Sequence, residues 1–426
     1  MQFPRMFRLR QRCNGPTLAD VAGAVKREVE NLSLAERIQP GDSVAVTAGS
    51  RGIANIALIL ETVVGHLIDL GARPFLVPAM GSHGGARAEG QRAVLARYGI
   101  TPELIGCEIR SSMETVVIGQ TPGGLPIHFD RHAHAADHVF VVNRVKPHTR
   151  FVGDIESGLH KMLLIGLGKH AGAQLYHRAI FDHDFATILH AVAEQVIAKC
   201  RVAGGLGIVE NGREETALVA GVAPSGFAPR ERELLRQARA WMPRLPFGEC
   251  DLLIVDEIGK EISGAGLDTN IAGRKFDDKK STPQDQIQVK RIFVRGLTEA
   301  TGGNATGIGI ADFTNERTVA AIDRRITAIN CITGGHPTAA AIPIAFPTDR
   351  QSIEAALLTM GLVEPPSAKL IQIANTLELR ELWASETYFE AARTDERIEI
   401  LSDPQPMRFD ASENLHPVHA GATPDK

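Results

Sequence analysis

Two short apolar runs near the start of the chain are each followed by a loop and then by helical periodicity. The apolar runs cover residues 42–47 and 74–78, and the helical patterns that follow them cover residues 55–70 and 88–98. Buried strands that alternate with helices in this way are typical of a parallel sheet covered by helices. The pattern therefore predicts an α/β fold with largely parallel sheets.

Polar side chains follow three of the predicted strands. A third apolar run covers residues 138–145 and ends at Lys146-Pro147-His148, where proline stops a central strand. Arg51 and His83 occupy the loops after the first two runs. Ligands of open α/β sheets bind outside the carboxyl ends of the strands, so Arg51, His83 and His148 are expected at one crevice.

The pattern changes near the middle of the chain. Residues 243–248 are rich in proline and glycine, and a new buried strand is expected at 252–255. We therefore expect two α/β domains, residues 1–247 and 248–410. The polar, small-residue tail at 411–426 is expected to be frayed.

The second half repeats the strand and helix signals of the first. Downstream of the third strand, the patterns predict helices at 185–198, 230–241, 318–329 and 352–360, short β-runs on either side of Asn211-Gly212, and further apolar runs at 291–294, 307–311 and 370–373.

Charge and cysteine usage narrow the functional classes. The 46 Lys and Arg residues against 50 Asp and Glu residues give a net charge of -4, which argues against a nucleic-acid or anionic-membrane surface. The five cysteines lie far apart, which fits a reducing cytoplasm and argues against a zinc or disulfide framework. No apolar stretch is suited to a signal peptide or a membrane span. A small-molecule partner is favoured.

Three local motifs carry weaker signals. His128, His132, His134 and His138 share one segment, but surface or turn histidines are a commoner explanation than a zinc site. Residues 166–170, Gly-Leu-Gly-Lys-His, lack the Ser or Thr that follows the lysine of a phosphate loop. No dinucleotide fingerprint follows the first strand.

The richest segment covers residues 143–177, where histidine and lysine recur in a Gly-rich setting. Together with the earlier Gly81-Ser82-His83, it holds Pro147-His148, Lys161 and His177 in order, and the last two are sixteen residues apart. This arrangement resembles the lactate racemase family, whose members carry a nickel pincer nucleotide. The resemblance covers most of the chain and implies that the active site lies in the cleft between the two α/β domains.

The resemblance implies a set of roles for these residues. It implies that Lys161 is joined covalently to the cofactor, pyridinium-3-thioamide-5-thiocarboxylic acid mononucleotide with nickel, and that His177 ligates the metal. It also implies that His83 and His148 are the two catalytic bases. Enzymes that make the cofactor would be transient partners of the chain.

The sequence departs from the family in two places. Gly158-Leu159-His160-Lys161 stands where a Gly-Gly-Arg-Lys run is usual, and Lys169 is the alternative cofactor lysine. The first loop, residues 47–51, lacks the family's aspartate, which implies a substrate other than lactate. In the second domain Asn270, Arg274 and Lys275 are candidate substrate contacts, with no basis for choosing among them.

The residue types suit this chemistry. The hydrogen beside a carboxylate is a very poor acid, so it leaves more easily as a hydride, and no amino acid accepts hydride. Histidine suits proton transfer near neutral pH and also binds nickel. Arg51 offers a bidentate cation for the substrate carboxylate.

We therefore predict a cytoplasmic isomerase, a racemase or epimerase, that acts on a 2-hydroxy acid. The alternatives are a nucleotide-dependent 2-hydroxy acid oxidoreductase and a non-catalytic binding protein of the same fold.

Overall fold

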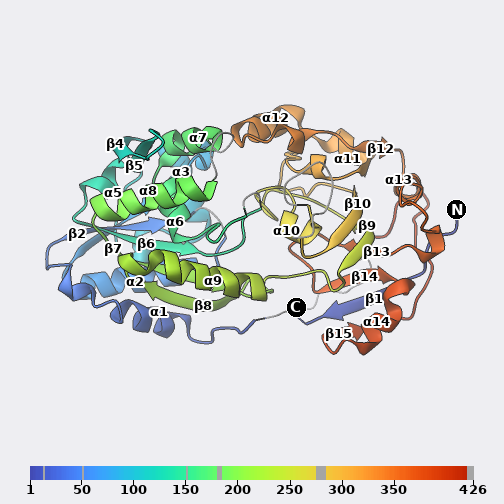
Figure 1. The fold of residues 1–426 in the computed structure, drawn as a ribbon, viewed down its shortest axis with the longest axis horizontal. Helices are drawn as coiled ribbons and strands as arrows, with labels where there is room; N and C mark the ends of the chain where they lie inside the picture. Colours follow the sequence, from blue (N-terminus) through green and yellow to red (C-terminus); the bar gives the residue numbers. More distant parts are fainter. Residues whose placement is uncertain (13–14, 50–51, 150–151, 180–184, 275–284, 420–426) are drawn as a thin grey trace. The chain divides into compact units, whose positions relative to one another are not determined.

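The computed structural model describes residues 1–12, 15–49, 52–149, 152–179, 185–274 and 285–419. The chain divides into two compact α/β units, which are coloured along the sequence in Figure 1. The first α/β unit is Asn14–Met242, and the second combines Met1–Cys13 with Pro243–Lys426. Their main sheets are largely parallel, which confirms the predicted fold class.

The first α/β unit is built on a five-stranded sheet with the order β3-β2-β6-β7-β8. Strands β3, β2, β6 and β7 are parallel, and β8 is antiparallel to β7. A separate antiparallel hairpin joins β4 and β5. The bounds are β2 Ser43–Ala48, β3 Arg73–Pro78, β4 Thr115–Gln120, β5 Pro126–Asp130, β6 His138–Arg144, β7 Val202–Glu210 and β8 Thr216–Val222.

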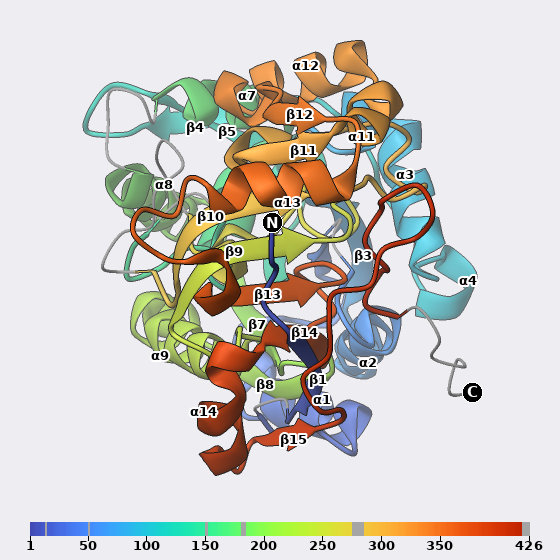
Figure 2. The ribbon, with the colours of Figure 1, turned by 90° about the vertical axis from the view of Figure 1, so that its right-hand side faces the viewer.

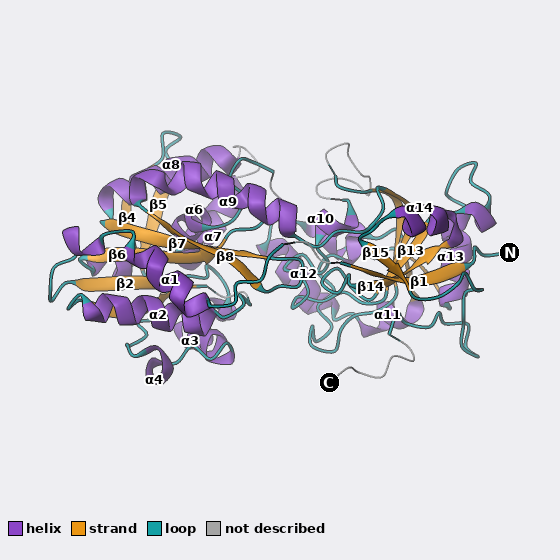
Figure 3. Ribbon diagram, turned by 90° about the horizontal axis from the view of Figure 1, so that it is seen from below, coloured by secondary structure: helices purple, strands orange, loops and turns teal. Residues whose placement is uncertain are grey.

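Helices cover both faces of this sheet, with α1 and α2 on one side and α8 and α9 on the other (Figure 3). The bounds are α1 Val21–Glu30, α2 Ile56–Asp69, α3 Ala88–Arg97, α4 Pro102–Ile105, α5 Arg131–Ala135, α6 Leu159–Lys161, α7 Lys169–Ala179, α8 Phe185–Lys199 and α9 Phe227–Trp241. A π-helical segment, Met162–Gly166, lies between α6 and α7.

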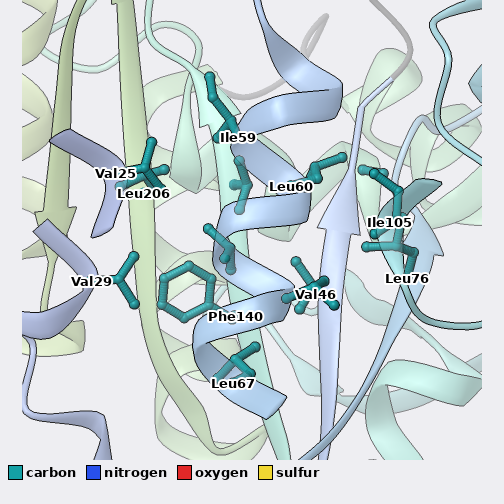
Figure 4. Close-up of a cluster of buried hydrophobic side chains, with 14 of the residues drawn as sticks. Val25, Val29, Val46, Ile59, Leu60, Leu67, Leu76, Ile105, Phe140 and Leu206 are labelled. Atoms are coloured by element: carbon teal, nitrogen blue, oxygen red, sulfur yellow. The ribbon is translucent and has the colours of Figure 1, made fainter. Parts of the chain in front are cut away.

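The apolar runs are continuous because both faces of each central strand are buried. In β2, Val46 packs with Phe140 and Leu206 in the core beneath α1 and α2, which Figure 4 shows in close-up. Its neighbour Ala45 points to the opposite core, where it packs with Val139. Alternation with a period of two, buried on each side, explains why these strands are nearly continuous apolar runs.

The second α/β unit contains an eight-stranded sheet with the order β12-β11-β10-β9-β13-β14-β1-β15, which Figure 2 shows in succession. The bounds are β1 Met6–Gln11, β9 Glu249–Val255, β10 Gln288–Val294, β11 Phe313–Asn315, β12 Ile344–Phe346, β13 Leu370–Ile373, β14 Glu381–Ser385 and β15 Ile398–Ile400. Its helices are α10 Thr269–Ala272, α11 Glu316–Ala321, α12 Arg324–Thr333, α13 Asp349–Leu357 and α14 Phe389–Thr394.

The two ends of the chain differ from the sequence-based expectation. Residues 1–13 were expected in the first domain, but β1 pairs antiparallel with β14 and β15. The expected frayed tail began at residue 411, but Leu415 and Val418 are buried. The backbone N–H of Val418 donates to Asp256 Oδ2 at 2.7 Å, so the last described residues are anchored to the second α/β unit.

The apolar run at residues 307–311 contains a 3-10 turn, Ile308–Ile310, and Gly307 before it has a φ of +98°. One helix prediction in the second α/β unit is wrong. The expected helix at 318–329 is two helices, α11 and α12. Asp323 separates them, and its carboxylate accepts the backbone N–H groups of Arg325 and Ile326 as an N-cap.

Among the described residues, no helix is both long enough and apolar enough to span a lipid bilayer.

Candidate active site

The carboxyl ends of three neighbouring parallel strands meet at one edge of the first unit's sheet. His83 follows β3, and His148 follows β6. Strand β2 lies between these two and is parallel to both. The loop after β2 contains Arg51, which lies outside the described residues. The sequence therefore placed the His83 and His148 loops at the correct edge of the sheet.

The loop that carries His83 packs against the residues that follow Lys161. The backbone N–H of Gly81 points to Gly166 O at 3.5 Å, and Ser82 Oγ lies 3.1 Å from His170 Nδ1. Gly81 has a φ of +57°, and a Cβ at this position would lie 3.1 Å from Ile165. Glycine therefore permits both the turn and the close approach. The His83 side chain itself is exposed.

A buried carboxylate organises the loop that carries His148. Glu156 accepts the backbone N–H of His148 at 2.7 Å and that of Gly153 at 3.1 Å. Arg239 from α9 donates to the same carboxylate at 2.7 Å. The ring of His148, which is half-buried, lies 6.4 Å from the ring of Phe185. The Glu156 carboxylate, paired with Arg239, thus holds the backbone that carries the His148 imidazole.

Lys161 is the last residue of α6, and its side chain is half-buried. Helix α6 contacts β6, and the π-helical segment that follows it contacts β6 as well. Asn143 near the end of β6 donates to Gly158 O at 2.8 Å, just before α6. Segments that π-helices interrupt are often functional. The three segments that carry His83, His148 and Lys161 therefore gather at the same edge.

His160, the residue before Lys161, is hydrogen-bonded to a second buried carboxylate, that of Glu231. His160 Nδ1 lies 2.5 Å from Glu231 Oε2, and the backbone N–H of His160 donates to the same oxygen at 3.1 Å. Both side chains are almost inaccessible to solvent. Glu231 belongs to α9, so this pair fixes α6 to that helix.

Lys169, the alternative cofactor lysine, is fully buried. Its Nζ forms an ion pair with Asp130 Oδ2 at 3.1 Å and donates to Pro78 O at 2.6 Å. Burial lowers the pKa of Lys169, and the neighbouring Asp130 carboxylate partly opposes that shift. A buried amine with these partners is poorly suited to a covalent bond with a cofactor.

His177 is a residue of α7, and its side chain lies outside what the structure describes. The preceding residue, Tyr176, is buried, and burial raises the pKa of its hydroxyl to about 12. Its hydroxyl therefore stays protonated at neutral pH.

The second-domain candidates have different surroundings. Arg274 is buried and forms an ion pair with Asp312 at 2.7 Å, and it also donates to two backbone carbonyls. Asn270 Nδ2 donates to Asp268 Oδ1 at 2.9 Å. Lys275 lies outside the described residues. Arg274 therefore has a structural role in the second α/β unit.

A lysine that the sequence reasoning did not select follows β9. Lys260 Nζ donates to Gly264 O at 2.6 Å and to Asn330 Oδ1 at 2.9 Å. Arg51, His83 and His148 were selected because each follows a predicted parallel strand. The same criterion would also have selected Lys260.

The histidine-rich segment runs from β5 into the start of β6, and its first and last histidines have ordinary hydrogen-bond partners. His128 Nδ1 lies 3.0 Å from Thr115 Oγ1, and His138 Nε2 lies 3.2 Å from Asp42 Oδ2. Within the described ranges, no three His, Cys, Asp or Glu side chains are grouped as metal ligands.

The second α/β unit has a cavity of about 340 Å³ near the ends of β9, β10 and β13. Its charged lining is largely paired internally: Arg295 forms ion pairs with Asp256 and with Asp349, and Arg317 lies 3.0 Å from Asp349. Burial raises the pKa of Asp256. A ligand here would compete with these existing pairs, so the edge of the first unit is the better candidate site.

Comparison with known proteins finds a family match over the first α/β unit. Residues 13–188 match the family model described as the lactate racemase N-terminal domain. The matched range contains His83, His148, Lys161 and His177. The predicted resemblance to that family is confirmed. The comparison with curated proteins gives no match.

Solved structures share the fold. A protein from Thermotoga maritima is 12% identical, with a TM-score of 0.52, over 86% of this chain and 99% of its own. The lactate racemase apoprotein from Thermoanaerobacterium thermosaccharolyticum is 15% identical, with a TM-score of 0.50, over 82% of this chain and 86% of its own.

Proposed function

We propose that this chain is a racemase or epimerase of a 2-hydroxy acid, and that it uses His83 and His148 as its two bases. The observation that carries the proposal is the strand order β3-β2-β6. Neighbouring strands lie about 4.8 Å apart, so the loops of His83 and His148 start about 10 Å apart on either side of the loop of Arg51. That separation leaves room for a small acid between two imidazoles.

The residues at this edge fit the nickel pincer nucleotide of the lactate racemase family. Lys161 supplies a primary amine for the covalent bond, and His177 supplies an imidazole, a ligand that suits nickel. When bound, this group supplies the hydride acceptor that no side chain can provide.

The chain's own residues bind the acid and move its proton. Arg51 anchors the substrate carboxylate as a bidentate donor. One histidine takes the hydroxyl proton, and the other returns a proton on the opposite face, so each enantiomer has its own base. The buried Glu156 holds the His148 backbone, which keeps that imidazole in place through both steps.

The test is chiral chromatography of a panel of 2-hydroxy acids and sugar acids. The protein should be produced together with the enzymes that make the cofactor. We expect interconversion of one enantiomeric or epimeric pair, with abolition in His83→Ala and in His148→Ala. His134→Ala is the matched control because His134 is also exposed and lies in α5, which precedes β6 and is therefore at the opposite end of that strand from His148.

Two outcomes would contradict the proposal. Net loss of the hydroxy acid with release of a keto acid would indicate an oxidoreductase. Ligand binding with no interconversion, in protein shown by mass to carry the cofactor, would indicate a non-catalytic binding protein.

A further inference from the structure

Three buried polar side chains lie directly beneath the loop that carries His83. Lys169, Gln91 and Asp130 are each inaccessible to solvent, and they come from three separate elements, α7, α3 and β5. Gln91 Oε1 accepts a hydrogen bond from Lys169 Nζ at 3.3 Å, and Lys169 Nζ forms an ion pair with Asp130 at 3.1 Å. Burying such groups is costly unless each one has partners. Their remaining partners therefore indicate what the cluster does.

Asp130 accepts the backbone N–H groups of His132 and Ala133 at the start of α5. The remaining partners of Lys169 and Gln91 are backbone carbonyls of a single loop. Lys169 Nζ donates to Pro78 O at 2.6 Å, and Gln91 Nε2 donates to Gly81 O at 3.0 Å and to His83 O at 3.4 Å. Lys169 thus binds the start of the loop at Pro78, and Gln91 binds its middle at Gly81 and the backbone of His83. The His83 side chain itself is exposed.

This loop needs such support because its three glycines give its backbone little conformational preference of its own. Gly81, Gly84 and Gly85 all have positive φ, at +57°, +66° and +66°. Glycine loses more conformational freedom on ordering than any other residue, so a loop with three of them is poorly fixed by its own preferences. Its internal hydrogen bonds include His83 N to Met80 O and Ala86 N to Ser82 O, both at 3.1 Å.

We propose that Gln91 and Lys169 are positioning residues for the His83 base. This inference rests on the proposed function, in which His83 serves one enantiomer and His148 serves the other. Gln91 and Lys169 touch neither substrate nor cofactor in this account, and they act only through the His83 backbone. Their effect is therefore confined to the enantiomer that depends on His83.

The first experiment measures a single turnover from each pure enantiomer. Cofactor-loaded protein in excess is mixed with the acid and quenched, and the 2-keto acid is counted as its hydrazone. Gln91→Leu should slow keto acid formation about 10- to 100-fold from the enantiomer that His83→Ala impairs, since displacement of a base by about 1 Å has effects of that size. The rate from the other enantiomer should stay within two-fold.

The second experiment needs no cofactor. Amide hydrogen exchange of the apoprotein should become at least ten-fold faster in a peptide covering residues 79–87 of Gln91→Leu. Gln91→Glu should behave in the same way, because its carboxylate still accepts from Lys169 but has no N–H for Gly81 O and His83 O. This second variant preserves the test if the leucine substitution fails to fold.

A matched control separates positioning from a loss of stability. Gln372 is also a buried glutamine, and its Nε2 donates to Asp256 Oδ1 and to His416 O, both at 2.9 Å, in the second α/β unit. Gln372→Leu should lower stability without a preference between enantiomers and without a change in exchange at 79–87. The double variant Lys169→Met/Asp130→Asn removes the buried ion pair without leaving a lone charge, and it should reproduce the enantiomer preference of Gln91→Leu.

The outcomes distinguish failure of the inference from failure of the proposed function. Equal slowing of both enantiomers in Gln91→Leu, or unchanged exchange at 79–87, would overturn the positioning role. If His83→Ala itself slows neither enantiomer, the proposed function is wrong for His83. Exchange in the apoprotein would then still decide whether Gln91 holds the loop.

Discussion

The pair formed by His160 and Glu231 offers the sharpest test of how the segment around Lys161 is held. The perturbation is Glu231→Gln, which keeps the size and shape of the side chain. Glu231 Oε2 accepts two N–H groups of His160, at 2.5 Å and 3.1 Å. Its other oxygen, Oε1, is buried without a hydrogen-bond partner.

The expected loss of stability follows from these contacts. With the glutamine oxygen on His160, the new amide NH₂ must occupy the position of Oε1, a buried position next to the Gly158 backbone where the carboxylate oxygen has no hydrogen-bond partner. An unpaired buried polar group costs about 1 to 3 kcal/mol, and loss of the carboxylate weakens the two remaining bonds. We therefore expect the free energy of unfolding of the first α/β unit to fall by about 3 kcal/mol.

The assay is urea unfolding followed by tryptophan fluorescence. The sequence has two tryptophans, Trp241 in α9 and Trp383 in β14. In a Trp383→Phe background, Trp241 reports on the unit that contains Glu231. Glu233→Gln is the control, because Glu233 lies on the same helix in an exposed pair with Arg230 and should change stability by less than about 0.5 kcal/mol. An equal midpoint for Glu231→Gln and Glu233→Gln would refute the reasoning.

Three further predictions use the same unfolding assay. Gly158→Ala should cost at least about 3 kcal/mol, since φ at Gly158 is +150° and the added Cβ would lie 2.0 Å from Glu231 Oε1; a smaller loss would show that the segment before α6 adapts easily. Leu206→Ala in the core of β7 should cost about 2 to 5 kcal/mol, whereas Leu104→Ala, at 48% exposure, should have almost no effect. Hydrogen bonds from Arg213, Asn211 and Thr17 lower the pKa of Glu215 to about 2 from its ordinary 4.5. The stability that the Glu215 carboxylate contributes is therefore present above pH 4.5 and is lost as the pH falls toward 2. Glu215→Gln should flatten the dependence of the unfolding midpoint on pH in that window, and because the carboxylate is 41% exposed the effect at neutral pH should stay below about 1 kcal/mol.

The central strands could be predicted from the sequence because each buried strand is a short run of apolar residues that is visible without its neighbours. Residues 42–47, 74–78 and 138–145 were expected as strands, and β2, β3 and β6 agree with these runs to within one residue at each end. Strand β1 was missed because Arg8 and Arg10 interrupt its apolar pattern. Both arginines pair with Glu381 of β14, more than 370 residues away, and no local pattern predicts such a partner.

The same distinction applies to the candidate site. The positions of His83 and His148 follow from the rule that ligands bind at the ends of parallel strands. The groups that hold these histidines could not be predicted in this way. Glu156 and Gln91 act through backbone atoms of loops, and their types and spacing form no motif. Lys169 lies in a visible motif, but only packing shows that its amine is buried against Asp130.

The most direct test of the central claim is mass spectrometry of protein produced together with the cofactor-making enzymes. The account predicts an intact-mass adduct that maps by proteolysis to the peptide containing Lys161. The adduct should be lost in Lys161→Ala and retained in Lys169→Met/Asp130→Asn. An adduct that persists in Lys161→Ala and maps to Lys169, or fully active protein with no adduct at all, would contradict the assignment of Lys161 as the residue that holds the cofactor.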